Sequence, residues 1–180
     1  ELTNAIVEVS KIKLLEELKK EELDPGITVR EVIEKKKDKL TGAGLLFTFS
    51  DERNSKSLIY ADSHLIEILL SNIINNSIKY TPAGGKILLR IFDKEENFCI
   101  SINDTGIGIP KDELSKISVE FYRASNAKSN RIEGTGLGLF VVKQIIENHN
   151  GIMRIESPSE IGDKESPGTE IEMEIPYIKI

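Results

Sequence analysis

Residues 169–176, with the sequence TEIEMEIP, alternate glutamate with isoleucine or methionine. Because successive side chains of a β-strand point to opposite faces of its sheet, this alternation predicts a strand with one apolar and one solvated face. Segments 86–93 and 97–104 also read as strands, and the short charged turn at 94–96 between them predicts a hairpin. A sheet with one solvated face takes its covering helices on the other face, so the chain is expected to form two layers.

The remaining segments supply the other helices and strands of these layers. Asp62 is a good N-cap for a long helix that extends to about residue 80, and a glycine-rich stretch opens another that ends near residue 149. Further helices are predicted over 1–23 and 28–40, with a short one near 111–116, and further strands over 43–50, 56–61 and 152–157. The predicted fold class is an α/β (α+β) two-layer sandwich, in which about three helices cover one face of a mixed, mostly antiparallel sheet.

A helical stub is expected ahead of this fold. Its apolar residues recur at gaps of three or four, as an amphipathic helix requires: Leu2, Ala5, Val9, Ile12, Leu15 and Leu18. The sequence Asp24-Pro25-Gly26 then predicts a turn. Two interpretations remain open, a surface helix packed on its own domain or half of a helical hairpin, and the break that follows favours the hairpin. We therefore expect two units, residues 1–23 and residues 24–180.

The composition and charge of the chain argue against several classes of protein. The chain has 180 residues and a net charge of -6, and it shows no basic stripe that would neutralise the phosphates of a nucleic acid. A single cysteine, Cys99, excludes an intramolecular disulfide and a thiolate metal cluster, which suits a reducing cytoplasm, and its strand position favours a packing role. No signal peptide and no apolar run of membrane-spanning length is visible. Because the chain starts at Glu1 rather than Met, we expect a fragment of a longer protein.

The first candidate site lies on the predicted helix 62–80. Asn72, Asn76 and Lys79 are spaced four and three residues apart, so they share one stripe of that helix, with Tyr80 at its margin. The two carboxamides can coordinate a hard cation through oxygen, and the ammonium can meet a phosphate. For these residues taken alone, a solvated polar helix face is the default interpretation, and the stripe by itself is weak evidence for a site.

The second candidate follows the strand 97–104. Asp104 stands at the end of that strand, with Gly106 and Gly108 directly after it. A carboxylate in this position can accept a hydrogen bond from the amine of a base, and the glycines allow close approach of the backbone. The alternative is an ordinary turn that starts with aspartate.

The third candidate is the glycine-rich stretch EGTGLGLF, residues 133–140. Gly134, Gly136 and Gly138 match neither a P-loop, which needs a following Gly-Lys-Ser/Thr, nor the dinucleotide fingerprint, which needs a strand before it. A hinge between a mobile loop and a helix N-terminus fits better, with free N–H groups over 136–138 that can hold a β- or γ-phosphate oxygen. Close packing of a helix entry would explain this motif alone, but three such motifs in order are harder to explain by packing.

Together these segments resemble a known family. NIINNSIKYTP (72–82), DTGIGIP (104–110), FYR (121–123) and GTGLGL (134–139) are similar to the N, G1, F and G2 boxes of the ATP-binding catalytic domain of sensor histidine protein kinases. These kinases form part of the gyrase, Hsp90, histidine-kinase and MutL ATPase superfamily. The resemblance spans about residues 24–176, implies the Bergerat ATP-binding fold, and makes the stub at 1–23 the end of the second helix of a dimerisation hairpin.

The resemblance also implies roles for the candidate residues. Asn76 would hold the Mg²⁺ that bridges the triphosphate, Asn72 would support it, Lys79 would meet phosphate, and Tyr80 would lie against the nucleotide. Asp104 would accept from the adenine amino group. The further nucleotide-binding residues implied are Gly106, Gly108, Ile109 and Thr169 near the base, and Arg123, Gly134, Thr135, Gly136, Leu137 and Gly138 in the lid and its hinge. Arg131, also in the lid, is a candidate for contacting the γ-phosphate during transfer.

One substitution separates kinases from hydrolases. The ATP hydrolases of the superfamily carry a glutamate four residues before the metal-binding asparagine, as the base for the attacking water, and here that position is Asn72. Because an amide cannot take a proton, a phosphate donor is favoured over a hydrolase. Neither His64 nor His149 is followed by the acidic residue that the phosphoacceptor histidine of the family has, so the acceptor is expected outside this chain.

The expected function is therefore a protein-histidine kinase domain of a two-component system, which donates the γ-phosphoryl group of Mg-ATP to that histidine. The implied partners are the dimerisation hairpin of a homodimeric parent kinase and a response regulator, with no nucleic acid. The implied location is the cytoplasm, with the parent anchored in the inner membrane through upstream segments.

Two alternatives remain open, an anti-sigma-type serine kinase and a non-catalytic ATP-binding module. Ser118 stands where the family has the first phenylalanine of the F box, which puts the anchoring of the lid in question and favours the module. The segment EIGDKESPG, residues 160–168, is longer than the corresponding family loop and is expected to change only the surface.

Overall fold

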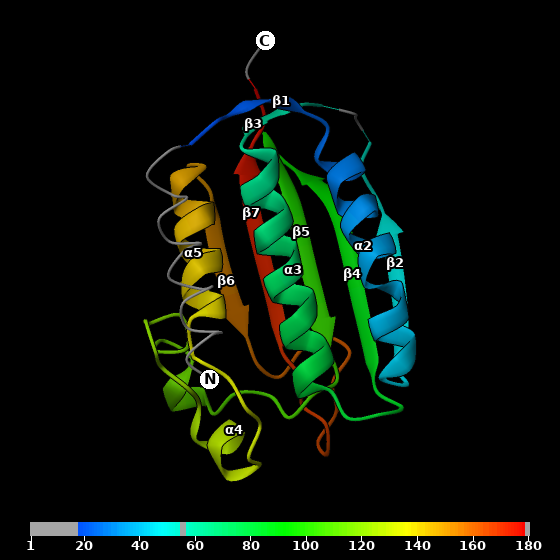
Figure 1. Ribbon diagram of the computed structural model, residues 1–180, viewed down its shortest axis with the longest axis vertical. Coiled ribbons are helices and arrows are strands. Elements are labelled where there is room, and N and C mark those ends of the chain that lie inside the picture. The colour runs from blue at the N-terminus through cyan, green and yellow to red at the C-terminus, as the bar shows by residue number, and fades with distance from the viewer. Residues whose placement is uncertain (1–17, 55–56, 179–180) are drawn as a thin grey trace.

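A five-stranded sheet forms one layer of the structure (Figure 1). The computed structural model describes residues 18–54 and 57–178. Across the sheet the strands are β2 (Leu46–Asp51), β4 (Lys86–Lys94), β5 (Asn97–Asp104), β7 (Glu170–Pro176) and β6 (Ile152–Glu156). Only β2 and β4 pair in parallel, and β4, β5, β7 and β6 pair antiparallel with their neighbours. The prediction of a mixed, mostly antiparallel sheet, and of a hairpin at 94–96, is confirmed.

Within residues 18–54 and 57–178, three long helices form the second layer, all on one face of the sheet (Figure 1). They are α2 (Pro25–Gly42), α3 (Ser63–Tyr80) and α5 (Gly138–Asn148). Two short elements, the 3₁₀ turn η1 (Lys111–Glu113) and α4 (Ser125–Ser129), lie in the long connection between β5 and α5, and α4 was not predicted. Fully buried side chains such as Leu69 and Ile73 of α3 meet Ile100 and Ile102 of β5 in the core between the layers. The predicted two-layer sandwich is therefore confirmed.

The alternation in 169–176 predicts that Glu170, Glu172 and Glu174 face solvent on the outer side of the sheet, and Glu174 departs from this prediction. Glu174 is buried, because Lys94 donates to its carboxylate at 2.9 Å and Arg154 pairs with the same oxygen from the other side. Cys99, the cross-strand neighbour of Glu174, is also buried. Burial, with the nearby charges of Glu174 and Glu172, raises the pKa of its thiol to about 12. The thiol stays protonated, in agreement with a packing role.

The helix predicted over 1–23 is wrong at its C-terminal end. Residues 21–23 form the strand β1 (Glu21–Leu23), which pairs antiparallel with β3 (Ile59–Ala61) in a separate two-stranded sheet. This pairing between distant segments overrides the local helical pattern, and residues 1–17 lie outside the described residues. The turn predicted at 24–26 is instead the start of α2, where Asp24 accepts a hydrogen bond from Gly26 N at 2.9 Å and Pro25 takes the first helical position.

His149 has a structural role at the junction of three segments. Asp62 caps α3 as predicted, because its Oδ1 accepts from Leu65 N at 3.1 Å. The backbone N–H of Asp62 donates to His149 Nε2 at 3.0 Å, so the proton of the ring lies on Nδ1 and donates to Ile145 O at 2.7 Å. The other histidine, His64, is exposed in the first turn of α3. These placements match the prediction that each histidine has either a structural or a solvent-facing position.

We expect His149 to make the domain sensitive to mild acid. Burial lowers the pKa of His149 below its usual 6.5, and the charge of Lys20 acts in the same direction while Asp62 opposes it. The unfolded chain then binds more protons below about pH 6.5, so stability is lost as the pH falls through that value. Urea unfolding at pH 7.5 and 5.5 should show a larger loss of unfolding free energy for the wild type than for His149→Gln. Equal losses would contradict this assignment.

Candidate functional site

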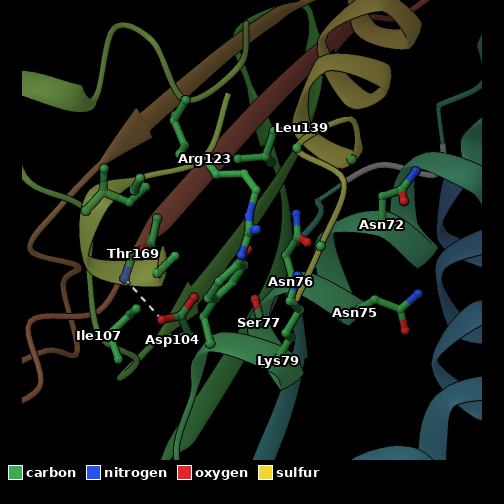
Figure 2. Close-up of a pocket in the computed structure, with 18 of the residues that line it drawn as sticks. Asn72, Asn75, Asn76, Ser77, Lys79, Asp104, Ile107, Arg123, Leu139 and Thr169 are labelled. Carbon is green, nitrogen blue, oxygen red and sulfur yellow. Dashed lines mark hydrogen bonds between the residues drawn. The ribbon is translucent and has the colours of Figure 1, made fainter. Parts of the chain in front are cut away.

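A cavity of about 590 Å³ lies between the C-terminal half of α3 and the connection from β5 to α5 (Figure 2). It collects most of the residues that the sequence singled out, from segments far apart in the chain. Those that line it are Asn72, Asn76, Lys79, Tyr80, Asp104, Gly108, Ile109, Arg123, Gly134, Thr135, Gly136, Gly138 and Thr169. The three candidate motifs therefore form one site.

Three predicted site residues do not line this cavity. Leu137 is fully buried, because it turns into the interior just before α5 begins. Gly106 is buried behind Asp104, and its backbone N–H donates to Asp104 Oδ1 at 2.8 Å, so its contribution is indirect. Arg131 is exposed and adopts a φ of 54° just after the end of α4, which leaves its side chain outside the cavity. The other predicted site residues border the cavity in this conformation.

Sequence reasoning missed several residues of the cavity wall. Ser77 lies beside Asp104, and Asn126 of α4 donates from its side chain to the backbone oxygens of Ile107 and Gly108, at 3.3 and 2.8 Å. Lys39 of α2 also borders the cavity, and its Nζ donates to Asn75 Oδ1 at 2.9 Å. Ser77 follows Asn76 directly and could have been found from the N-box segment. The contacts of Lys39 and Asn126 depend on how distant segments pack, which no local pattern reports.

Asp104 forms one end of the site. Its Oδ1 accepts backbone hydrogen bonds from Gly106 N at 2.8 Å and Thr169 N at 3.2 Å, and Ser77 also bonds to its carboxylate. Burial nevertheless raises the pKa of Asp104 to about 6, since the carboxylate is only 6% exposed. The remaining acceptor capacity faces a wall that includes the apolar Ile109. This end can bind a flat, mostly apolar group that presents an N–H donor.

The other end gathers amides, an ammonium and a helix N-terminus. A Cβ atom added to Gly138, the first residue of α5, would lie 3.6 Å from Asn76 Nδ2 and 3.8 Å from Asn72 Oδ1. The Nδ2 of Asn72 is buried and has no hydrogen-bond partner within the described part of the chain. Lys79 extends its Nζ to Gly134 and passes 4.8 Å from the centre of the Tyr80 ring. Uncapped N–H groups at α5, one ammonium and an unpaired amide form a binding site for an anion.

The segment between η1 and α5 covers the cavity as a lid, which we define as residues 114–137. Glu113, the last residue of η1, anchors this lid. Its carboxylate accepts from Tyr122 OH and Ser125 N, each at 2.9 Å, and from Ser125 Oγ at 2.5 Å. These bonds and those of Asn126 provide the anchoring that Ser118 put in question. Gly136 allows the lid to turn into α5, because it adopts a φ of 77° and a Cβ there would lie 2.6 Å from Tyr122 O.

The carboxylates of the site do not form a metal centre by themselves. Among the described residues, no group of three or more His, Cys, Asp or Glu side chains could hold a metal ion. Asn76 offers an amide oxygen near the ammonium group of Lys79 and the N-terminus of α5. A hard cation at Asn76 would therefore need most of its oxygen ligands from a bound phosphate and from water, which is the way Mg²⁺ usually binds with nucleotides.

Comparison with known sequences decides the family. Residues 61–179 match the model of the family described as Histidine kinase-, DNA gyrase B-, and HSP90-like ATPase. The chain belongs to this ATPase family. The match begins at the last residue of β3 and includes α3, Asn76, Asp104 and Gly138, so the four sequence boxes lie within the family domain.

Relatives of this ATPase domain include sensor histidine kinases. Sensor histidine kinase WalK of Bacillus subtilis (strain 168) is 38% identical over 118 residues, which are 64% of this chain and 18% of WalK. The catalytic domain of histidine kinase ThkA is 27% identical with a TM-score of 0.72, covering 88% of this chain and 95% of that domain.

Two larger structures share the fold. Full-length ShkA in complex with AMPPNP has a TM-score of 0.80 at 22% identity, covering 99% of this chain and 36% of ShkA. ThkA in complex with response regulator protein TrrA has a TM-score of 0.73 at 23% identity, covering 98% of this chain and 48% of that one. The chain spans only about a fifth of the length of curated relatives such as WalK. In the described residues, no helix has both the length and the apolar character needed to cross a membrane.

Proposed function

We propose that this chain is the catalytic and ATP-binding domain of a sensor histidine kinase, and that it donates the γ-phosphoryl group of Mg-ATP to a histidine on a dimerisation hairpin outside the chain. One observation carries the proposal. The cavity presents a buried carboxylate, Asp104, at one end, and Asn72, Asn76, Lys79 and the N-terminus of α5 at the other. This polarity suits a base at one end and phosphates at the other.

At the base end, the residues of this chain would bind and orient adenine. The ionised Asp104 would accept from the exocyclic amine, while Ile107 and Ile109 offer apolar surface to the ring. The Oδ1 atom is already held by Gly106 and Thr169, so the carboxylate is oriented before a nucleotide arrives. Pre-organisation of this kind reduces the entropy lost on binding.

At the phosphate end, Asn76 would hold Mg²⁺ together with the phosphate oxygens, and Asn72 would support it. The bound Mg²⁺ would supply neutralisation of the phosphate charge. Lys79 and the N–H groups of α5 would orient the triphosphate, and the lid would exclude water from it. The partnerless Nδ2 of Asn72 is a donor that a phosphate oxygen could satisfy.

The nature of residue 72 favours transfer to a protein acceptor over hydrolysis. The Asn72 amide cannot take a proton from water, and Asp104 is engaged with Gly106 and Thr169 at the opposite end of the cavity. The described histidines are also remote from the phosphate end. Along the axis of α3, His64 lies about 18 Å from Asn76. His149 directly follows the C-terminal end of α5, whereas Gly138 of the phosphate end begins that helix. The acceptor histidine would therefore come from another domain.

A reconstitution experiment tests this function. The chain would be mixed with a separate dimerisation hairpin that carries the acceptor histidine, and supplied with γ-labelled Mg-ATP. Labelled phosphohistidine on the hairpin, stable in base and labile in acid, is the expected product. Nucleotide binding without any such product would instead favour a non-catalytic ATP-binding module, and acid-stable phosphoserine on an added substrate would favour a serine kinase.

The parent protein would then act in a two-component pathway. We infer a homodimeric parent that faces the cytoplasm, is anchored in the inner membrane by segments outside this chain, and passes its phosphoryl group to a response regulator. The sensor kinase names of the relatives and the complex of ThkA with TrrA support the response-regulator part of this inference.

A further inference from the structure

The loop between β6 and β7, residues 157–169, packs directly behind Asp104. It joins β5 through two backbone bonds, in which Asp104 N donates to Thr169 O and Gly168 N donates to Gly106 O, each at 3.0 Å. At Gly168, which adopts a φ of 67°, a Cβ atom would overlap Asp104 O. The loop and the Asp104 turn are therefore in backbone-to-backbone contact, which contradicts the expectation that residues 160–168 change only the surface.

Ser159 makes the central side-chain contact of this loop. It is 7% exposed, and its Oγ donates to the backbone oxygen of Asp104 at 2.7 Å. Its own N–H donates to Pro167 O at 2.8 Å, so the hydroxyl is held in place by the closure of the loop. Ser159 itself does not line the cavity, so it can affect a ligand only indirectly, through Asp104 or through the neighbouring Gly168 and Thr169.

Ser157 connects the same loop to the base wall. Its Oγ donates to Gly168 O at 2.7 Å and accepts from Ile109 N at 3.0 Å. One of these partners, Ile109, borders the cavity. The other, Gly168, directly precedes Thr169, whose N–H donates to the Asp104 carboxylate. The far side of the loop is fixed to the sheet by an ion pair of 2.6 Å between Arg90 and Glu160. The loop is thus fastened both to the site and to the outer face of β4.

From these contacts we propose that Ser159 is a positioning residue for base recognition. Its bond to Asp104 O sets the orientation of the peptide group between Asp104 and Thr105. That peptide group leads directly to the Gly106 N–H, which holds the Asp104 carboxylate from within the same turn. Without the Ser159 bond this peptide group is held only at its N–H, where Thr105 N donates to Lys86 O at 3.0 Å, so its carbonyl can tilt and the Asp104 carboxylate is directed less firmly toward the exocyclic amine. This inference rests on the function proposed above.

Two nucleotides separate positioning from general support of the pocket. The affinities of the wild type and Ser159→Ala would be measured by calorimetry for Mg-ATP and for the magnesium complex of purine riboside triphosphate, which lacks the exocyclic amine. We expect S159A to weaken Mg-ATP binding about tenfold, the value of one hydrogen bond in a buried site, and to leave the amine-free nucleotide unchanged. Ser166→Ala, in the same loop, is the matched control and should change neither affinity.

A second variant of Ser159 shows whether the loss of affinity in S159A comes from the missing hydrogen bond or from misfolding. Ser159→Cys keeps nearly the volume of serine but offers only a weak donor, so it should show the same selective loss. Equal losses for both nucleotides in S159A and S159C, or no loss for either, would overturn the positioning role while leaving the proposed function intact. A wild type that binds both nucleotides equally well would instead overturn the base assignment of Asp104, and this inference with it.

Discussion

Replacing Asn76 with alanine is expected to reduce phosphoryl transfer from Mg-ATP about 1000-fold, the scale seen when one electrostatic contact to a transition state is removed. Asn76 lines the cavity with Lys79, and its amide oxygen lies 3.7 Å from the position of a Cβ atom on Gly138, the first residue of α5. Alanine would remove that oxygen, and the cation would be left with phosphate and water ligands alone. The rate of phosphohistidine formation on a separate hairpin, at saturating Mg-ATP, measures the effect.

The control for N76A is another asparagine that is remote from the cavity. Asn54 lies in the connection between β2 and β3, where its backbone N–H bonds to Asp93 at 2.8 Å. Asn54→Ala should leave the transfer rate within about twofold of the wild type, because a surface substitution away from the site has little effect. If N76A kept a rate within tenfold of the wild type, Asn76 would not hold the metal.

The second large effect is expected for Asp104→Asn, which should weaken Mg-ATP binding about 100-fold, or about 2.7 kcal/mol. Two backbone donors, Gly106 N and Thr169 N, converge on Oδ1 of Asp104. They would fix the oxygen of an asparagine amide in the same place, so its NH₂ group would point toward the adenine amine. Two donors would then face each other in a buried pocket, which leaves both without a partner. Calorimetric titration with Mg-ATP measures the loss.

The pH dependence of binding provides the matched control for D104N. Because burial raises the pKa of Asp104 to about 6, this carboxylate is ionised at pH 7.5 and mostly protonated at pH 5. The acceptor is then lost, so the affinity of the wild type for Mg-ATP should fall as the pH falls through about 6. The D104N variant lacks this titration and retains only that of the nucleotide phosphates. Parallel pH profiles for the two proteins would show that Asp104 does not read the base.

Most of the fold was predictable because it depends on local patterns. Period-two alternation located the hairpin of 86–104, and the cap at Asp62 located the start of α3. By contrast, β1 was missed because its three residues form a strand only by pairing with Ile59–Ala61, and a pairing partner leaves no mark on the local sequence. The burial of Glu174 was missed for a similar reason, since its two cationic partners come from β4 and β6.

The candidate site also contains some residues that were predictable from the sequence and others that were not. Asn76, Asp104 and Gly138 belong to short motifs whose spacing is visible in the sequence, and the structure brings all three to one cavity. The residues that support them act through side-chain hydrogen bonds to other segments, three in the case of Glu113 and one in the case of Ser159. Serine and glutamate are common on any surface, so only the packed structure distinguishes these two from their neighbours.

The connector at residues 19–20 is attached to two of the helices that form the site. Lys19 N donates to Asp62 at the start of α3, and Lys20 Nζ donates to Asn148 O at the end of α5. Both attachments are at the ends of these helices that lie farthest from the cavity, while Asn76 and Gly138 are near the opposite ends. Residues 19–20 are therefore connected to the phosphate-binding end of the cavity by two separate paths, one along α3 to Asn76 and one along α5 to Gly138.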